Sequence, residues 1–93
     1  MDREPPEVLL LTREDCAYCH EAEQMLGRLV ADYGIAVKKL DLDTPEGREV
    51  AERGGILFPP GIFVDGEPFS YGRPSERKLR RELQRRGAAV GGG

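Results

Sequence analysis

The sequence predicts an α/β domain with the element order β-α-β-α-β-β-α, in which a four-stranded mixed sheet is flanked by helices. Three observations predict this fold. The apolar run at 8–12 is typical of a strand buried on both faces. A helical apolar stripe follows over 22–33, and an Asp-Gly turn at 65–66 joins two short strand-like segments. The crossover through the first helix makes the first two strands parallel, whereas the closing hairpin is antiparallel.

The first helix has the clearest periodic pattern in the chain. Asp15 is expected to cap its start, and Gly34 stands where a left-handed glycine commonly ends a helix. Between them, apolar residues recur at intervals of three and four, so that one stripe faces the sheet. The residues of this stripe are Ala22, Met25, Leu26, Leu29, Val30 and Tyr33.

The middle of the chain predicts a strand and a short helix. Residues 35–42 alternate between apolar and charged side chains at their end, which indicates the second strand. Thr44 and Pro45 then supply a hydroxyl cap and a proline in the first helical turn. Gly54 and Gly55 end that helix.

The last third of the chain predicts a hairpin and a helix. The hairpin strands are 61–64 and 67–71. Pro68 has no N–H to donate across the sheet, so the second of these strands is expected at the edge. Ser75 is the cap of a final helix over 75–86.

The length of 93 residues suits one domain, which at this size buries somewhat over ~60% of its unfolded surface. We assign residues 8–86 to that domain. Residues 1–7 are expected to form an extended lead, and residues 87–93 a flexible Gly-rich tail.

Charge and hydropathy argue against two classes of partner. The formal net charge is −3, whereas a general nucleic-acid binder carries excess positive charge to replace phosphate counterions. The longest apolar run, at 8–11, is strand-sized and far below the ~18 residues of a membrane span. No apolar signal core follows the acidic, Pro-rich N-terminus, so we expect a cytoplasmic and therefore reducing location.

Cys16 and Cys19 stand at the junction of the first strand and the first helix. This spacing returns two helical side chains to one face, where their sulfurs can form a disulfide. A bridge over so short a loop stabilises little, so redox chemistry explains the pair better than a structural role. Cys16 faces unpaired N–H groups and the positive end of the helix dipole, and Arg13 would add positive charge. We therefore expect Cys16 to attack a substrate disulfide and the more buried Cys19 to resolve the product.

Other roles for the pair stay open. A C-x-x-C motif is half of a zinc site, but a tetrahedral site needs four ligands and the chain's single histidine is His20. One chain cannot complete such a site, whereas a metal or iron–sulfur cluster shared between two chains remains an alternative, as do inert cysteines. His20 itself is expected to be a solvated surface residue rather than a catalytic base.

The segment 60–66 reads Pro-x-Ile-Phe-Val-x-Gly and, with the upstream C-x-x-C, resembles the glutaredoxins and related thioredoxin-fold redoxins. The resemblance covers residues 8–86. It implies the thioredoxin fold with a cis-proline at Pro60, beside the cysteines, and a preceding residue whose backbone pairs with the substrate. That residue would be Pro59, which can offer only its carbonyl. Otherwise Pro59 is itself the cis residue and Phe58 does the pairing.

The flanks of these motifs resemble two subgroups of redoxins. Tyr18 is similar to the residue of dithiol glutaredoxins at this position. Arg13 and His20 look like those of the redoxins that feed ribonucleotide reductase and are recharged by thioredoxin reductase. Gly72 and Arg73 favour the second subgroup, although Arg73 fits a solvated turn equally well. The substrate-binding residues that the resemblance implies are Arg13, Tyr18, Pro59, Pro60, Gly72 and Arg73.

We therefore expect a thiol–disulfide oxidoreductase that reduces protein or low-molecular-weight disulfides through a Cys16/Cys19 dithiol cycle. It needs no bound cofactor, because its electrons come from glutathione or from NADPH through a flavoprotein such as thioredoxin reductase. Expected partners are disulfide-bearing proteins and one of these reductants, with no nucleic acid and no membrane, and the protein is expected to be a monomer. The basic last helix is typical of a solvated face, and an acidic protein partner is its alternative.

Three alternative functions remain for the cysteine pair. The first is glutathione-dependent deglutathionylation by Cys16 alone, which would survive the change Cys19→Ser. The second is an iron–sulfur or metal carrier, a dimer bridged by a cluster on Cys16 thiolates, which would be brown when purified anaerobically. The third is a non-enzymatic adaptor, for which Cys16 would be no more reactive than a free cysteine.

Overall fold

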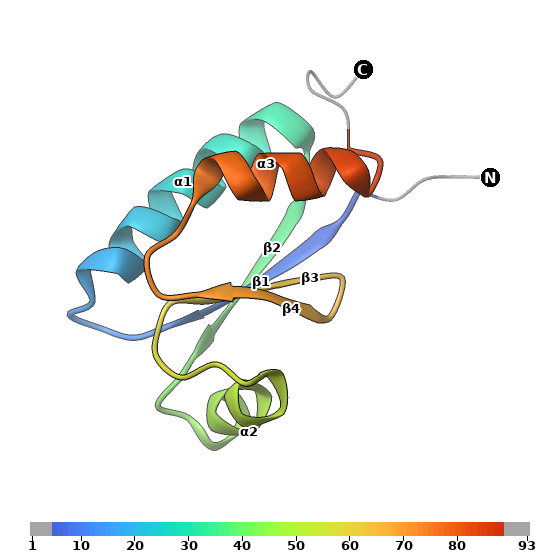
Figure 1. Ribbon diagram of the computed structural model, residues 1–93. Helices are drawn as coiled ribbons and strands as arrows, with labels where there is room; N and C mark the ends of the chain where they lie inside the picture. The colour runs from blue at the N-terminus through green and yellow to red at the C-terminus, as the bar shows by residue number, and fades with distance from the viewer. Residues whose placement is uncertain (1–4, 89–93) are drawn as a thin grey trace.

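The computed structural model describes residues 5–88 and has the predicted element order (Figure 1). The ends of the four strands and of the last helix each lie within one residue of the ends that the sequence predicts. The strands are β1 (Glu7–Thr12), β2 (Ala36–Asp41), β3 (Gly61–Val64) and β4 (Glu67–Tyr71). The helices are α1 (Ala17–Tyr33), α2 (Pro45–Gly54) and α3 (Glu76–Arg85).

The sheet is mixed, with the strand order β2-β1-β3-β4. β1 and β2 are parallel, and β3 is antiparallel to both β1 and β4, which confirms the predicted crossover and hairpin. Pro68 lies on the edge strand β4, as predicted. Asp65 and Gly66 between β3 and β4 both have positive φ, at 51° and 82°, which is the backbone twist that a two-residue hairpin needs.

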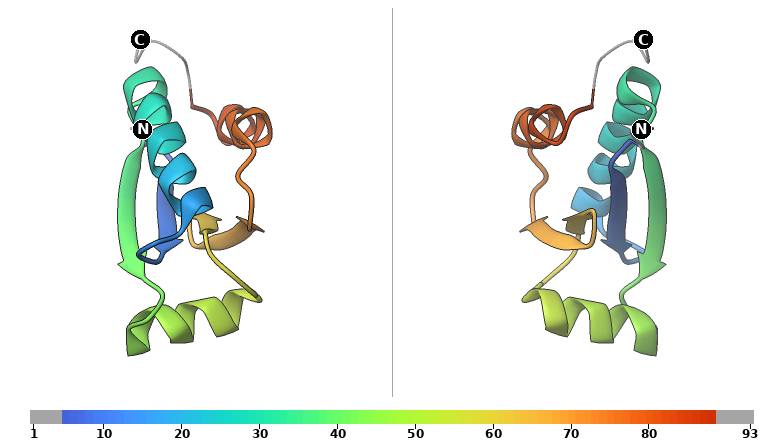
Figure 2. Two further views of the ribbon diagram at one scale, coloured as in Figure 1. Left: turned by 90° about the vertical axis from the view of Figure 1, so that its left-hand side faces the viewer. Right: turned by 90° about the vertical axis from the view of Figure 1, so that its right-hand side faces the viewer.

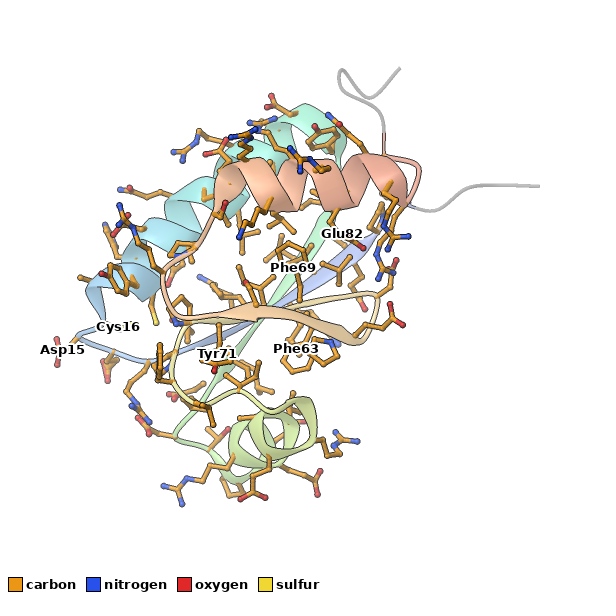
Figure 3. The ribbon with its side chains drawn as sticks, viewed as in Figure 1. Asp15, Cys16, Phe63, Phe69, Tyr71 and Glu82 are labelled. Carbon is orange, nitrogen blue, oxygen red and sulfur yellow. The ribbon has the colours of Figure 1, made fainter. Side chains whose placement is uncertain are left out.

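Helices cover both faces of the sheet. α1 and α3 lie on one face and α2 lies on the other (Figures 1 and 2). Val8 and Leu10 of β1 pack toward α1 and α3, whereas Leu11 packs toward α2, so the central strand is buried on both faces as predicted. The hairpin also contributes to both faces, because side chains in a strand point to alternate sides of the sheet. Phe63 packs in the cluster on the α2 side and Phe69 packs against the cluster on the α1 and α3 side (Figure 3).

Two details of α1 differ from the sequence prediction. The cap is Cys16 and not Asp15, because Asp15 has a φ of 57° and lies one residue outside the capping position. Val30 is 41% exposed, whereas the other five apolar residues of the predicted stripe are buried. Gly34 ends the helix with a φ of 69°, and this part of the prediction is confirmed.

The ends of the domain extend slightly beyond the predicted limits. Glu7 of the predicted lead is the first residue of β1. The backbone N–H groups of Gly87 and Ala88, two residues of the predicted tail, donate hydrogen bonds to the carbonyls of Gln84 and Leu83. The rest of the predicted tail, and most of the lead, lie outside the described residues. Within residues 5–88, every helix is too short or too polar to cross a membrane.

Candidate active site

Cys16 occupies the N-cap of α1. Its backbone is extended, with φ −118° and ψ 110°, and its Sγ accepts a hydrogen bond of 3.2 Å from the backbone N–H of Cys19. The sulfur thus has the place that a serine or aspartate oxygen usually takes at the start of a helix. The N–H donor and the positive end of the helix dipole both stabilise a negative charge on this sulfur.

The two thiols have unequal surroundings. Both are free, Cys16 is partly exposed, and Cys19 is only 2% exposed. Burial raises the pKa of the Cys19 thiol, and its hydrogen bond with Cys16 raises it further, against smaller opposing effects of Thr12 and the backbone of Arg13. Cys19 is therefore held as a buried, protonated thiol, and Cys16 is the sulfur that an incoming molecule reaches.

A groove of about 540 Å³ opens beside the cysteines. Both cysteines line it, together with other residues of the segment 13–23, so it follows the loop before α1 and the first turns of the helix. Figure 3 shows Cys16 and Asp15 at this outer end of α1. A substrate that occupies the groove would therefore lie against Cys16.

The charge of Arg13 is already matched by a carboxylate. Its guanidinium forms an ion pair of 3.1 Å with Asp43, and its Nε lies 3.2 Å from both oxygens of that side chain. The structure therefore does not support the prediction that Arg13 stabilises the Cys16 thiolate. A signal for this pair was present in the sequence, because the residues that follow two parallel strands meet at one edge of the sheet, and Thr12 pairs with Asp41 in the register.

A second group of predicted site residues lies in the two segments that precede β3 and follow β4. The Pro59–Pro60 peptide bond is cis, which agrees with the assignment of Pro60 and leaves Pro59 in the preceding position without an N–H. Gly72 donates a backbone hydrogen bond of 2.9 Å to the carbonyl of Pro60. Its φ is 81°, and a side chain there would place Cβ 2.7 Å from the Phe58 ring. The positive φ and the close approach of the Phe58 ring both require a glycine at position 72.

Sequence reasoning missed an aromatic pair in this second group. The rings of Phe58 and Tyr71 meet edge to face with centroids 5.0 Å apart, and the two residues are 53% and 40% exposed. Tyr18 is also exposed and lies outside the lining of the groove. Arg73 is exposed and makes no side-chain hydrogen bond or ion pair with the residues that the structure describes.

No group of three or more metal-ligating side chains comes together within residues 5–88. The single histidine, His20, is exposed, and its Nε2 lies 3.4 Å from the amide nitrogen of Gln24. This arrangement agrees with the solvated role predicted for His20.

No protein-family model matches the chain. A probable thioredoxin of Archaeoglobus fulgidus is 28% identical over 76 residues, which cover 82% of this chain and 84% of the relative. An uncharacterized protein of Mycobacterium bovis is 33% identical over 84 residues, covering 86% and 84% of the two chains. A solved structure of a mutant thioredoxin from Halobacterium salinarum superposes with a TM-score of 0.68 at 23% identity, over 88% of this chain and 74% of that one.

The likeness to the solved structure shows the thioredoxin fold, which the sheet order and the helices on both faces also display. The Archaeoglobus fulgidus relative is named a probable thioredoxin and not a glutaredoxin, so the subgroup resemblance to glutaredoxins stays a prediction. With the fold, the relatives and the Cys16/Cys19 pair taken together, this chain belongs to the thioredoxin-fold dithiol redoxins and is a thiol–disulfide oxidoreductase.

Proposed function

We propose that the protein reduces protein or low-molecular-weight disulfides through a dithiol cycle of Cys16 and Cys19. One observation carries the proposal, namely that two free thiols of unequal burial share the first turn of one helix. The more accessible sulfur, of Cys16, accepts an N–H hydrogen bond at the start of the helix, and burial raises the pKa of the Cys19 thiol.

The cycle has two exchange steps. The Cys16 thiolate attacks one sulfur of the substrate disulfide, forms a mixed disulfide, and displaces the other substrate sulfur as a thiolate that takes up a proton. Cys19 then loses its proton and attacks the Cys16 sulfur. This second attack forms the Cys16–Cys19 disulfide and releases the remaining substrate thiolate. The substrate disulfide has gained the two electrons that the pair of cysteines has lost. Of the two protons that the product thiols take up, one is the proton that Cys19 loses and the other comes from the solvent, because Cys16 attacks as a thiolate.

Returning the pair to its dithiol form needs a further two-electron donor. As part of the proposal, this donor is glutathione or a flavoprotein reductase fed by NADPH, and the chain itself holds no cofactor. The protein acts as a monomer in the cytoplasm, where the thiol pool keeps such pairs reduced.

The test compares two recharging systems on the same protein. One assay contains NADPH with thioredoxin reductase, and the other contains NADPH with glutathione and glutathione reductase, each with a disulfide substrate. Turnover with either system supports the proposal and identifies the donor, whereas turnover with neither contradicts it. The variant Cys19→Ser separates the mechanisms, because a dithiol cycle stops in this variant while a monothiol deglutathionylation continues.

A further inference from the structure

The groove beside the reacting thiol is lined by an excess of carboxylates. Four acidic side chains line it, namely Glu14, Asp15, Glu21 and Glu23. Its basic lining consists of Arg13 and His20 alone. Because the groove is open to water on one side and is walled by protein on the other, these charges act on any ligand that enters it.

The cations near the groove pair with only one of these four carboxylates. Arg13 is paired with Asp43, which lies outside the lining, and Lys39 is paired with Glu23 at 3.4 Å. Glu14, Asp15 and Glu21 make no ion pair with any residue in the range 5–88, and all three are exposed. Three unpaired carboxylates therefore contribute negative potential to the groove that Cys16 also lines.

We propose that this groove selects disulfides whose flanking groups are cationic, such as a disulfide next to lysine or arginine side chains. The inference rests on the proposed function and names its substrate class. A disulfide flanked by carboxylates must bring its charge against Glu14, Asp15 and Glu21, and its encounter with Cys16 is slowed for that reason. Glutathione carries two carboxylates and one ammonium group, so its disulfide is a disfavoured substrate at this site.

The other strong charges of the surface lie elsewhere. Arg73 follows β4 and does not line the groove. The solvent-facing cations of α3, Arg77, Lys78 and Arg81, also lie outside the lining, and the groove follows the opposite end of α1 from the paired Asp32 and Arg80. These cations therefore do not offset the carboxylates that line the groove.

The test uses three small disulfides of similar size. Cystamine carries an ammonium group at each end, bis(2-hydroxyethyl) disulfide is neutral, and dithiodipropionate carries a carboxylate at each end. The groove variant combines Glu14→Gln, Asp15→Asn and Glu21→Gln, in which asparagine keeps the left-handed backbone of residue 15 accessible. The matched control removes three exposed carboxylates from α2, on the other face of the sheet, by Glu46→Gln, Glu49→Gln and Glu52→Gln.

Two quotients are measured for each variant. The cystamine quotient is the rate constant for cystamine divided by that for the neutral disulfide, and the dithiodipropionate quotient is the rate constant for dithiodipropionate divided by that for the neutral disulfide. Because each quotient is compared between variants on the same substrates, the intrinsic reactivity of each disulfide cancels. We expect the cystamine quotient to fall by about tenfold in the groove variant and the dithiodipropionate quotient to rise, with both unchanged in the control. High salt should change the quotients of the wild type as the groove variant does, lowering the cystamine quotient and raising the dithiodipropionate quotient. The reason is that the screening length falls from about 30 Å at 0.01 M to about 3 Å at 1 M.

The two possible failures have different signatures. If the wild type reduces the neutral disulfide but the quotients do not differ between the groove variant and the control, the charge selection is overturned and the dithiol function stands. If the wild type reduces none of the three disulfides, the proposed function itself is contradicted.

Discussion

Two ends of the molecule use charged side chains in opposite ways. At the outer end of α1, Glu14, Asp15 and Glu21 line the same groove as the partly exposed Cys16 and have no ionic partner within residues 5–88. At the other end, acidic and basic side chains form ion pairs with one another. We call this cluster the hairpin clasp, and it consists of Asp65, Glu67, Glu82, Arg85 and Arg86. Figure 3 shows Cys16 and Glu82 at these opposite ends.

The hairpin clasp ties α3 to the β3–β4 turn. Arg86 contacts Glu82 on its own helix at 2.6 Å, Asp65 in the turn at 3.3 Å, and Glu67 at the start of β4. Asp65 also accepts a hydrogen bond from the backbone N–H of Glu7 at the start of β1. The paired charges of the clasp connect α3, the β3–β4 hairpin and β1. The unpaired charges at the groove instead produce a negative electrostatic potential that acts on a ligand. The comparison predicts that changes at the groove alter chemistry and that changes at the clasp alter stability.

The largest effect is expected at the groove, from Cys16→Ser. A serine hydroxyl does not attack a disulfide, so reduction should fall to the rate without protein. Serine is also a favoured N-cap, so the melting temperature should stay at or above that of the wild type. Disulfide reduction and thermal unfolding, measured on one preparation, check both halves. Reduction that persists in a folded Cys16→Ser protein would show that the chemistry lies elsewhere.

A smaller effect is expected from Gly72→Ala, between the two ends. A φ of 81° costs a non-glycine residue about 1–2 kcal/mol, and the added Cβ must also displace the Phe58 ring. Gly27→Ala is the matched control, because a Cβ at that helical position meets no atom within 4 Å and alanine gains up to about 1 kcal/mol in a helix. Urea unfolding should therefore move in opposite directions for the two variants, and a Gly72→Ala protein as stable as the wild type would contradict this reading.

The smallest effect is expected at the hairpin clasp, from pH. Hydrogen bonds from Arg85 and then Arg86 lower the pKa of Glu82 to about 2, below its unfolded value. The stabilisation is therefore present at neutral pH and is lost as the pH falls from about 4.5 toward 2. Glu82→Gln should lower the melting temperature at pH 7, and this difference from the wild type should shrink over the same range.

The size of that effect is limited because the pairs are exposed to solvent. Glu49→Gln, at an exposed position with no ion pair within the described residues, is the control and should differ little from the wild type at any pH. A deficit of Glu82→Gln that is independent of pH would mean that the ionised carboxylate is not what holds the clasp.

Much of the fold was predictable because its signals are local. Thr44 with Pro45, Asp65 with Gly66, and Ser75 each act on their own turn, and each stands where the sequence predicts it. The cap of α1 was assigned wrongly because a sulfur is not among the usual capping groups. In the structure Asp15 has a positive φ of 57°, and Cys16 is the residue that caps the helix.

The site was predictable only where its residues are close in sequence. The C-x-x-C spacing identifies Cys16 and Cys19 without a structure. The pairing of Arg13 with Asp43, 30 residues away, depends on the register of two strands, and the contact of Phe58 with Tyr71 depends on how the loop before β3 packs against β4. Such partners decide whether a charge is available to a ligand. For Arg13 and Asp43 the sequence indicates only that residues following parallel strands meet at one edge of the sheet, and the register of the folded chain identifies the pair.

The central claim is that Cys16 and Cys19 alternate between two thiols and one disulfide within a single chain. The direct measurement is the mass of the tryptic peptide 14–28, which contains both cysteines, after mild oxidation and again after reduction. We expect the oxidised peptide to be lighter by two hydrogen atoms, to resist alkylation at both positions, and to regain both thiols with a reductant. An unchanged peptide mass after oxidation, or a disulfide that joins two chains instead, would contradict the account.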